Sequence, residues 1–348
     1  MLMLIIFGRI PYYKVNNYMI FGKDLTEQIK AVLAQKNVFA VTDDNVFRLY
    51  AELFDPARTF VFPAGESQKQ LAAVSGICAF LHQSGADRHS KIAAAGGGVA
   101  GDIAGFAAAV YMRGIPWVNI PTTLLAQCDS AVGGKTGVDL GAYKNIIGAF
   151  HFPEEVYFSA HFLKSLPGRE FLCGLGEIIK TACLSPKIFT YFTQNEQAVY
   201  RKNESVLANL VRLCADFKDS VVRQDPFEKT GLRKILNYGH TAGHAFEAAD
   251  NHRLSHGEYV LHGIRAENRM CRETVDPGIY GVIERWINRA LNGAETDFDL
   301  EKAVEAAAGD KKNAGGKISV VAVVRPGEHR EIFFTKEEFK QKLAEALS

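Results

Sequence analysis

The chain has 348 residues, of which 47% are hydrophobic and 23% charged, and its formal net charge is +1. This length and composition are those of a globular protein with two domains and a large buried core. A near-neutral charge gives no reason to expect a nucleic acid or a membrane surface as a partner.

The six cysteines are scattered without a C-x-x-C pair, which favours free thiols in a reducing compartment. The apolar run Leu2–Phe7 is too short for the core of a signal peptide. The most membrane-like window, Ile92–Met112, carries Asp102 near its centre, so a buried strand and helix explain it better than a membrane span. We therefore expect a soluble cytoplasmic protein.

The first half of the chain alternates β-rich runs with amphipathic stretches. Strands are predicted at Asn37–Thr42, Thr59–Phe62, Lys91–Ala95 and Trp117–Ile120, and helices at Val46–Phe54 and Ser67–His82. This β-α-β-α rhythm predicts a Rossmann-like parallel sheet with helices on its faces.

The predicted secondary structure changes after Pro167. Successive helices are predicted up to about residue 294, and a β-hairpin after them. The clearest of these elements are the helices Phe171–Ala182 and Ser205–Val222 and the strands Ile318–Val324 and Arg330–Phe334. We therefore expect an α/β domain at residues 1–167 and a mainly α-helical domain at residues 168–348.

A glycine-rich segment follows the strand predicted at Lys91–Ala95. Gly96, Gly98 and Gly101 satisfy G-x-G-x-x-G at the start of a helix, where glycines let the backbone approach a pyrophosphate. The alternative is a tight strand-to-helix turn without a ligand. Asp44 lies at the end of an earlier strand, where an acidic side chain can bind the hydroxyls of a ribose.

Lys135 lies in the segment DSAVGGKTG, which resembles the end of a phosphate-binding loop. Such a loop needs a glycine five residues before Gly134, and Asp129 occupies that position. A Walker A motif is therefore excluded, and Lys135 remains a candidate for binding an anion.

Histidines cluster late in the chain, where five of the ten lie between residues 240 and 262. His240 and His244 are spaced so that a helix would put both imidazoles on one face. The cluster favours a metal site about as strongly as it favours ordinary core or surface histidines. A zinc peptidase is disfavoured, because Thr241 stands where the H-E-x-x-H motif has its general-base glutamate.

Charged residues around the glycine-rich segments suggest an anion-binding site. Glu177 and Lys180, in GLGEIIK, are either a surface pair or a buried carboxylate with its cation. Basic and amide side chains that together suit a multiply anionic small molecule are Arg113, Lys135, Lys144, Lys180, Lys218, Arg233, Asn145 and Asn237.

Taken together, these segments resemble the 3-dehydroquinate synthase family of the sugar phosphate cyclases. The resemblance covers most of the chain and is dense from about Gly96 to His256. It rests on GGGVAGD, YMRG, PTTLLAQCDSAVGGKTG, KNIIGAF, LPGREF, GLGEIIK, LRKILNYGHTAGHAFE and SHGE, which occur in the family's order. The resemblance implies an NAD-binding α/β domain, a helical metal-binding domain and a homodimer.

Carried over position by position, the resemblance also implies a set of site residues. A divalent ion, Zn2+ or Co2+, would be held by Glu177, His240 and His256, while His244 would face the substrate. NAD would be held by Asp44, Glu66, Lys69, Gly97, Gly98, Val99, Asp102, Thr122, Thr123, Asp129, Lys135, Lys144, Phe162 and Ser165. The substrate would contact Arg113, Lys135, Lys144, Asn145, Lys180, Lys218, Arg233, Asn237, His244 and one lysine of the Lys311–Lys312 pair.

The activity implied by the resemblance is the conversion of 3-deoxy-D-arabino-heptulosonate 7-phosphate to 3-dehydroquinate and phosphate, a step of aromatic amino acid biosynthesis in the shikimate pathway. NAD would transiently oxidise a hydroxyl, phosphate would be eliminated, the hydride would return, and an intramolecular aldol step would close the ring. The metal ion would act as a Lewis acid. Lys135, Lys180 and Lys218 would stabilise oxyanions, and Arg233 would pair with a carboxylate.

Three alternatives remain at this point. Another sugar phosphate cyclase, such as a 2-deoxy-scyllo-inosose or valiolone-type synthase, would share the fold and cofactors, but Arg233, Asn237 and His244 favour a substrate that bears a carboxylate. A metal-dependent alcohol or glycerol dehydrogenase would also share the architecture, and the GGKTG and KNIIG segments argue against it. A non-catalytic NAD-sensing module would need no metal ligands.

Overall fold

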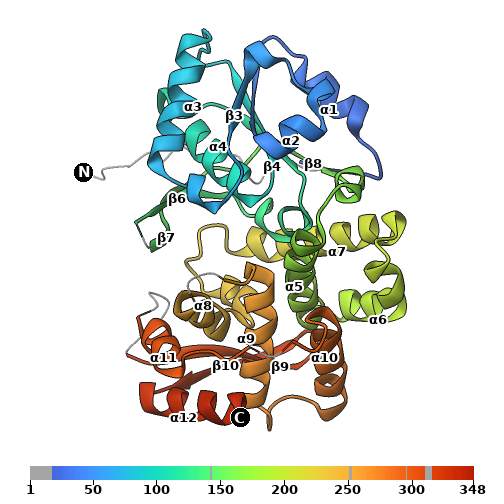
Figure 1. Cartoon of the computed structure of the whole chain (residues 1–348), viewed down its shortest axis with the longest axis vertical. Helices are drawn as coiled ribbons and strands as arrows, with labels where there is room; N and C mark the ends of the chain where they lie inside the picture. The colour runs from blue at the N-terminus through green and yellow to red at the C-terminus, as the bar shows by residue number, and fades with distance from the viewer. Residues whose placement is uncertain (1–17, 142, 251–252, 295, 310–315) are drawn as a thin grey trace, which may run out of the picture. The chain divides into compact units, whose positions relative to one another are not determined.

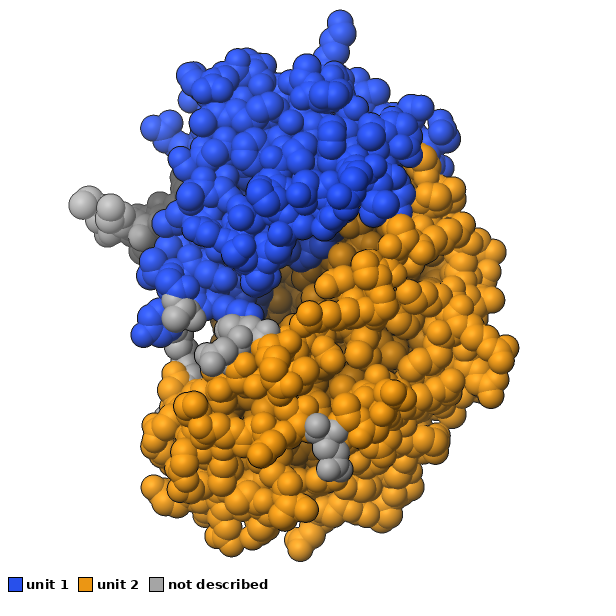
Figure 2. Space-filling model, in the orientation of Figure 1, with its two compact units in different colours: residues 1–21, 27–120, 134–158 blue, residues 22–26, 121–133, 159–348 orange. Residues whose placement is uncertain are grey.

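The computed structural model describes residues 18–141, 143–250, 253–294, 296–309 and 316–348. The chain folds into two compact units, coloured separately in Figure 2. Unit 1 comprises residues 1–21, 27–120 and 134–158, and unit 2 comprises residues 22–26, 121–133 and 159–348. Residues 121–133 thus group with the later part of the chain, although they precede the predicted domain boundary at residue 167, which stays a prediction.

Unit 1 is built on a six-stranded sheet with the strand order β1-β8-β5-β4-β2-β3. Its strands are β1 (Met19–Gly22), β2 (Val38–Asp43), β3 (Thr59–Phe62), β4 (Lys91–Gly96), β5 (Trp117–Pro121) and β8 (Glu155–Ser159). β2 pairs in parallel with β3 and β4, and β5 pairs in parallel with β8. The predicted parallel α/β architecture is therefore confirmed, and all four predicted strands are present to within a residue.

The helices around this sheet are α1 (Thr26–Leu33), α2 (Asp44–Leu49), α3 (Leu71–Gln83) and α4 (Gly98–Val110), with short turns η2 (Ala51–Leu53), η3 (Pro56–Arg58), η4 (Glu66–Gln68) and η5 (Tyr111–Arg113). α4 packs on β4 (Figure 1). Alanines and Ile103 of α4 are buried in the core of this unit. The helix predicted at Val46–Phe54 ends early, because Tyr50 leaves the helical region at φ −134° and ψ 39°. The helix predicted at Ser67–His82 begins later, at Leu71.

A two-stranded antiparallel ribbon, which the sequence did not predict, completes unit 1. Its strands are β6 (Lys135–Leu140) and β7 (Tyr143–Phe150). The strands cross closely at two glycines, since a Cβ atom on Gly148 would lie 2.2 Å from the carbonyl oxygen of Thr136.

Unit 2 is mainly helical, as predicted. Its helices are α5 (Gly168–Leu184), α6 (Pro186–Tyr200), α7 (Glu204–Gln224), α8 (His240–Ala249), α9 (His256–Met270), α10 (Pro277–Ala290), α11 (Leu300–Ala308) and α12 (Lys336–Leu347), with the π-helical turn η6 (Ala126–Ser130) and the 3-10 turns η7 (Ala160–Lys164) and η8 (Leu232–Asn237). The predicted hairpin is present as β9 (Ile318–Arg325) and β10 (Glu328–Phe334). In the part of the chain that the structure describes, none of the helices has the length and apolar character needed to cross a membrane.

The helix α9 organises the second unit. Phe246, Tyr259 and Phe298 pack with residues of β9 and α12 in one buried core. α9 packs against α5, α8, α10 and α12, so it lies at the centre of the helical unit (Figure 1). Its first residue is His256, which places that imidazole at a junction of several helices.

Candidate active site

Glu177 lies in the middle of α5, and its side chain is 1% exposed. The buried alternative for the Glu177–Lys180 pair is therefore correct. Small residues on α5 bring α9 close to it, because a Cβ atom on Gly176 would lie 2.3 Å from the carbonyl oxygen of Gly257. The carboxylate is thus held next to the first turn of α9.

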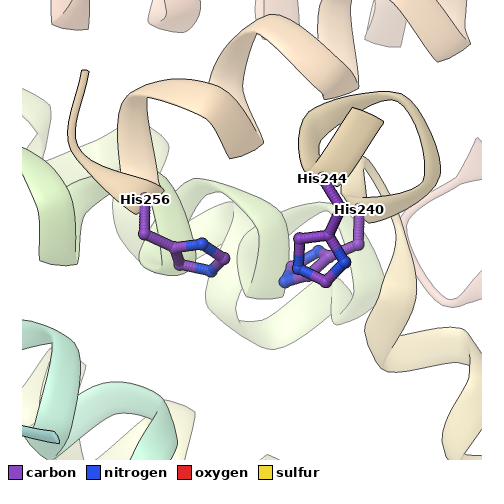
Figure 3. Close-up of side chains that lie close together, drawn as sticks. All are labelled: His240, His244 and His256. Atoms are coloured by element: carbon purple, nitrogen blue, oxygen red, sulfur yellow. The ribbon is translucent and has the colours of Figure 1, made fainter. Parts of the chain in front are cut away.

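Two histidines converge on this carboxylate. The Nε2 atoms of His240 and His256 each lie 3.4 Å from Oε1 of Glu177. His244, one turn after His240 on α8, joins them, and one ligand atom from each of the three imidazoles lies within 4.8 Å of the others (Figure 3). The predicted placement of His240 and His244 on one helical face is confirmed, with ring centroids 5.0 Å apart.

The outer nitrogens of the two rings nearest Glu177 have partners of their own. Nδ1 of His240 donates to the carbonyl oxygen of Tyr238 at 3.1 Å, and Nδ1 of His256 donates to the Glu247 carboxylate at 3.4 Å. When Nδ1 carries the proton, the lone pair of a neutral imidazole is on Nε2. Two Nε2 lone pairs and a buried carboxylate oxygen therefore face one point, which only a proton or a metal cation can occupy favourably.

The pKa values of this cluster reflect the same geometry. Burial works to raise the pKa of Glu177, but Lys180 and His240 outweigh it and hold the pKa well below its usual value. Burial and the positive charge of Lys180 lower the pKa of His240. For His256, burial is outweighed by Glu177 and Glu247, which raise its pKa to about 9. The carboxylate is thus held ionised, and the proton that this point attracts is bound on His256 rather than on His240.

These residues fit a zinc or cobalt ion by their chemistry. Two imidazole nitrogens and a carboxylate are the ligand types found at catalytic zinc sites. The partners of Nδ1, a backbone carbonyl and a carboxylate, are those that orient metal-binding histidines elsewhere. Glu247 was not assigned a role from the sequence, although its position one turn after His244 was the available signal.

Two lysines and a second carboxylate lie beside Glu177. Nζ of Lys180 contacts Oε2 of Glu177 and lies 3.5 Å from Asp129, and Nζ of Lys218 lies 2.9 Å from Oδ2 of Asp129. Asp129, in η6, was predicted to contact NAD, and here it bridges the two ammonium groups. Burial and the charge of Lys180 lower the pKa of Lys218, although Asp129 opposes the shift.

Arg233 is a further buried cation, at 5% exposure in the turn η8. Its guanidinium donates to the carbonyl oxygen of Pro226 at 3.2 Å and lies 3.3 Å from Glu228. Gly133 leaves room for it, because a Cβ atom there would lie 3.0 Å from the guanidinium. Asn237 is the last residue of the same turn.

In unit 1, five of the predicted cofactor residues lie in or against the first turns of α4. Gly97 precedes the helix without contributing a capping side chain, and Gly98 and Val99 begin it. Asp102 lies in the first turns of α4 and pairs with the buried Lys69 at 2.5 Å. A glycine cap on a helix of this kind suits a pyrophosphate, so the residues fit NAD chemically.

The other predicted contacts lie in turns, at the start of a helix and on the β6–β7 ribbon. Asp44 begins α2 and accepts the amide of Ala64 at 2.9 Å, while the neighbouring Asp43 caps that helix. The remaining positions are Glu66 in η4, Arg113 in η5 with φ 71°, Thr122, Thr123 with its hydroxyl on the amide of Ala126, Lys135 on β6, Lys144 and Asn145 on β7, Phe162 in η7, and Ser165 after it. Lys311 and Lys312 lie outside the described residues. The role of every predicted site residue stays a prediction.

The fold belongs to the class of the sugar phosphate cyclases. A crystal structure of 2-deoxy-scyllo-inosose synthase, complexed with carbaglucose-6-phosphate, NAD+ and Co2+, is 25% identical, with a TM-score of 0.81 over 93% of this chain and 95% of that one. A 2-epi-5-epi-valiolone synthase from Streptomyces hygroscopicus, solved with NAD+ and Zn2+, shares the fold at 24% identity and a TM-score of 0.84, covering 96% of this chain and 97% of its own. A probable glycerol dehydrogenase from Sinorhizobium meliloti shares it at 14% identity and a TM-score of 0.66, covering 94% of this chain and 95% of its own.

Within this class, the chain belongs to the 3-dehydroquinate synthase family. The model of the 3-dehydroquinate synthase N-terminal part matches residues 59–173, and that of the C-terminal part matches residues 174–313. The 3-dehydroquinate synthase of Alkaliphilus metalliredigens is 38% identical over 93% of this chain and 94% of its own length. That of Acetivibrio thermocellus is 40% identical over 89% of this chain and 88% of its own.

Proposed function

We propose that this enzyme is a 3-dehydroquinate synthase, which converts 3-deoxy-D-arabino-heptulosonate 7-phosphate to 3-dehydroquinate and phosphate. Membership of the family over most of the chain carries the proposal. The buried Glu177 between two imidazoles also supports the proposal. These residues suit a metal ion, and this reaction needs a Lewis acid next to the substrate's oxygens.

NAD and a divalent metal ion are the cofactors. When bound, NAD accepts and returns the hydride, and the metal ion polarises the oxygen at the carbon that is oxidised. Glu177, His240 and His256 are the proposed metal ligands, supported by the common point that their donor atoms face. His244 lies within reach of the same point, and we assign it to the substrate. The glycine start of α4 is proposed to hold the pyrophosphate of NAD.

The buried cations of unit 2 supply the charge that the substrate requires. Lys180 and Lys218 are proposed to stabilise negative charge on oxygen, because both ammonium groups are buried and fixed by Asp129 before substrate arrives. Arg233 is proposed to bind the carboxylate, for which its planar guanidinium offers paired donors. In unit 1, Arg113, Lys135, Lys144 and Asn145 remain proposed contacts of an anionic ligand.

Other sugar phosphate cyclases are the alternative, since two of them share the fold. Their identity of 24–25% is well below the 38–40% of the two 3-dehydroquinate synthases compared above. The buried Arg233 also favours a substrate with a carboxylate, which sugar phosphates such as glucose 6-phosphate lack.

The deciding experiment measures phosphate release. The protein is incubated with catalytic NAD, Zn2+ or Co2+ and heptulosonate phosphate, and 3-dehydroquinate is identified as the second product. Glucose 6-phosphate and sedoheptulose 7-phosphate are the matched alternative substrates, and Glu177→Gln is the inactive control. Turnover of either alternative substrate, without release from heptulosonate phosphate, would refute the proposal.

We further propose a homodimer and a cytoplasmic location, which family membership supports. A sedimentation coefficient of a monomer at micromolar concentration would contradict the dimer. We also propose that the NAD-binding domain comprises residues 1–167 and the metal-binding domain residues 168–348. The junction of the two family models at residues 173 and 174 supports this division.

A further inference from the structure

The helix that carries two of the three histidines begins without a cap of its own. α8 starts at His240, and the preceding residue is Gly239, in the left-handed region at φ 75°, which has no side chain to accept the first amides. Helices usually satisfy these amides with Ser, Thr, Asp or Asn at this position. The buried start of α8 therefore needs an acceptor from elsewhere.

A buried carboxylate on α9 supplies that acceptor. Glu267 is 1% exposed, and its Oε2 accepts the amide of Gly239 at 2.8 Å while Oε1 accepts the amide of Ala242 at 3.0 Å. A carboxylate at a helix N-terminus is favoured by both the hydrogen bonds and the helix dipole. The Glu267 side chain thus accepts the amides that precede and follow His240 in the first turn of α8.

The next residue of α9, Asn268, contacts Tyr238, and Tyr238 in turn contacts the His240 ring. The hydroxyl of Tyr238 donates to Oδ1 of Asn268 at 2.7 Å, and the carbonyl oxygen of Tyr238 accepts Nδ1 of His240 at 3.1 Å. Asn268, like Glu267, is 1% exposed. We define Glu267 and Asn268 as the α9 clamp.

The α9 clamp joins the two histidines nearest Glu177. α9 begins with His256 and carries Glu267 and Asn268 near its other end, so the helix that presents one imidazole also holds the start of the helix that presents the other. The two helices touch through their backbones at this point, because a Cβ atom on Gly263 would lie 2.0 Å from the carbonyl oxygen of Gly239.

We propose that Glu267 and Asn268 are positioning residues for the metal ion, which fix the place and the tautomer of His240 relative to His256. This inference rests on the proposed metal site. The carboxylate is required because both amides donate to it, and a glutamine offers them one carbonyl oxygen and an NH2 group, which cannot accept from an N–H. Loss of the Glu267 charge should therefore move His240 while Glu177 and His256 stay in place.

The test is Co2+ binding to the metal-free full-length protein, followed by visible absorption and by competition with a chromophoric chelator. For Glu267→Gln we expect affinity weaker by about 10-fold, the lower end of the usual cost of losing a direct partner of a metal-binding histidine, because Glu267 acts on His240 through the backbone. We also expect a changed Co2+ absorption spectrum. Glu267→Asp should restore part of the affinity, because it keeps the charge on a shorter side chain.

The matched control is Glu284→Gln. It removes the carboxylate that pairs with Arg265 of α9 at 3.3 Å, but it leaves the start of α8 untouched. Equal Co2+ affinities and spectra for Glu267→Gln and Glu284→Gln would overturn the inference. If Glu267→Gln does not fold, Tyr238→Phe is the second variant, because it removes only the hydroxyl that donates to Asn268. Wild-type Co2+ affinity and spectrum for Tyr238→Phe would then overturn the inference. A wild-type protein without affinity for Co2+ would instead refute the proposed metal site itself.

Discussion

The ammonium group of Lys218 contacts Asp129 twice, at the side-chain Oδ2 at 2.9 Å and at the backbone carbonyl at 2.8 Å. The two contacts join the long helix α7 to the π-helical turn η6. They also leave the lysine fixed in a buried site, with a pKa that burial and Lys180 hold below its usual value.

We predict that Lys218→Met lowers kcat by about 100-fold or more, the usual effect of removing one fixed donor from a developing oxyanion. Metal content should stay stoichiometric, because Lys218 pairs with Asp129, whereas Glu177 pairs with Lys180 and His240. Steady-state kinetics and elemental analysis check both statements. Lys187→Met, on the exposed face of α6, is the control and should keep wild-type kinetics.

The choice between His244 and Glu177 as metal ligands gives a second prediction. Glu177→Gln should lose stoichiometric zinc, because the buried amide cannot supply the negative charge. His244→Gln should keep its zinc and lose activity. The opposite pattern, with zinc retained by Glu177→Gln and lost by His244→Gln, would show that the three imidazoles hold the ion.

Stability against pH should report on His262 of α9. Burial and the charge of Arg265 lower its pKa to about 4, below its value of 6.5 in an unfolded chain. Between these values the unfolded state binds the proton and the folded state does not, so stability falls as the pH drops below about 6.5. From about pH 8 to about pH 5 the loss is about 2 kcal/mol.

Urea unfolding of the wild type and of His262→Leu, at both pH values, measures this contribution. The difference between the two proteins should change by about 2 kcal/mol, since other titrating groups are common to both. Parallel pH dependences of the two proteins would contradict the prediction.

Two helical glycines give a prediction about packing. Gly263→Ala should destabilise the protein by about 3 kcal/mol or more, because the new methyl group meets the backbone of Gly239 at 2.0 Å, which cannot move without α8. Gly281→Ala, in the exposed interior of α10, meets no atom within 4 Å and should stabilise by up to about 1 kcal/mol. Unfolding free energies from urea titration test both.

The sequence allowed the parallel strands and the helical second half to be predicted, because short β-rich runs and helical periodicity are local signals. The β6–β7 ribbon was missed because its strands contain glycines at the positions where they pair, and glycine is rare in predicted strands. The sequence could not show whether the Glu177–Lys180 pair is exposed or buried. Its burial depends on the contact of α5 with α9 at Gly257, which is distant in the sequence. The role of Glu267 could not be predicted from the sequence. It caps the start of α8 at Gly239, which lies 28 residues earlier in the chain.

The backbone contacts between α8 and α9, and between α5 and α9, have a consequence for how this site can change. Where glycines bring main chains together, backbone contact sets the spacing of the helices that carry Glu177, His240 and His256. Substitutions in the surrounding apolar core can therefore accumulate without shifting the ligands. We therefore expect a change of metal geometry, in evolution or in the laboratory, to begin at Gly176, Gly239, Gly263 or the α9 clamp.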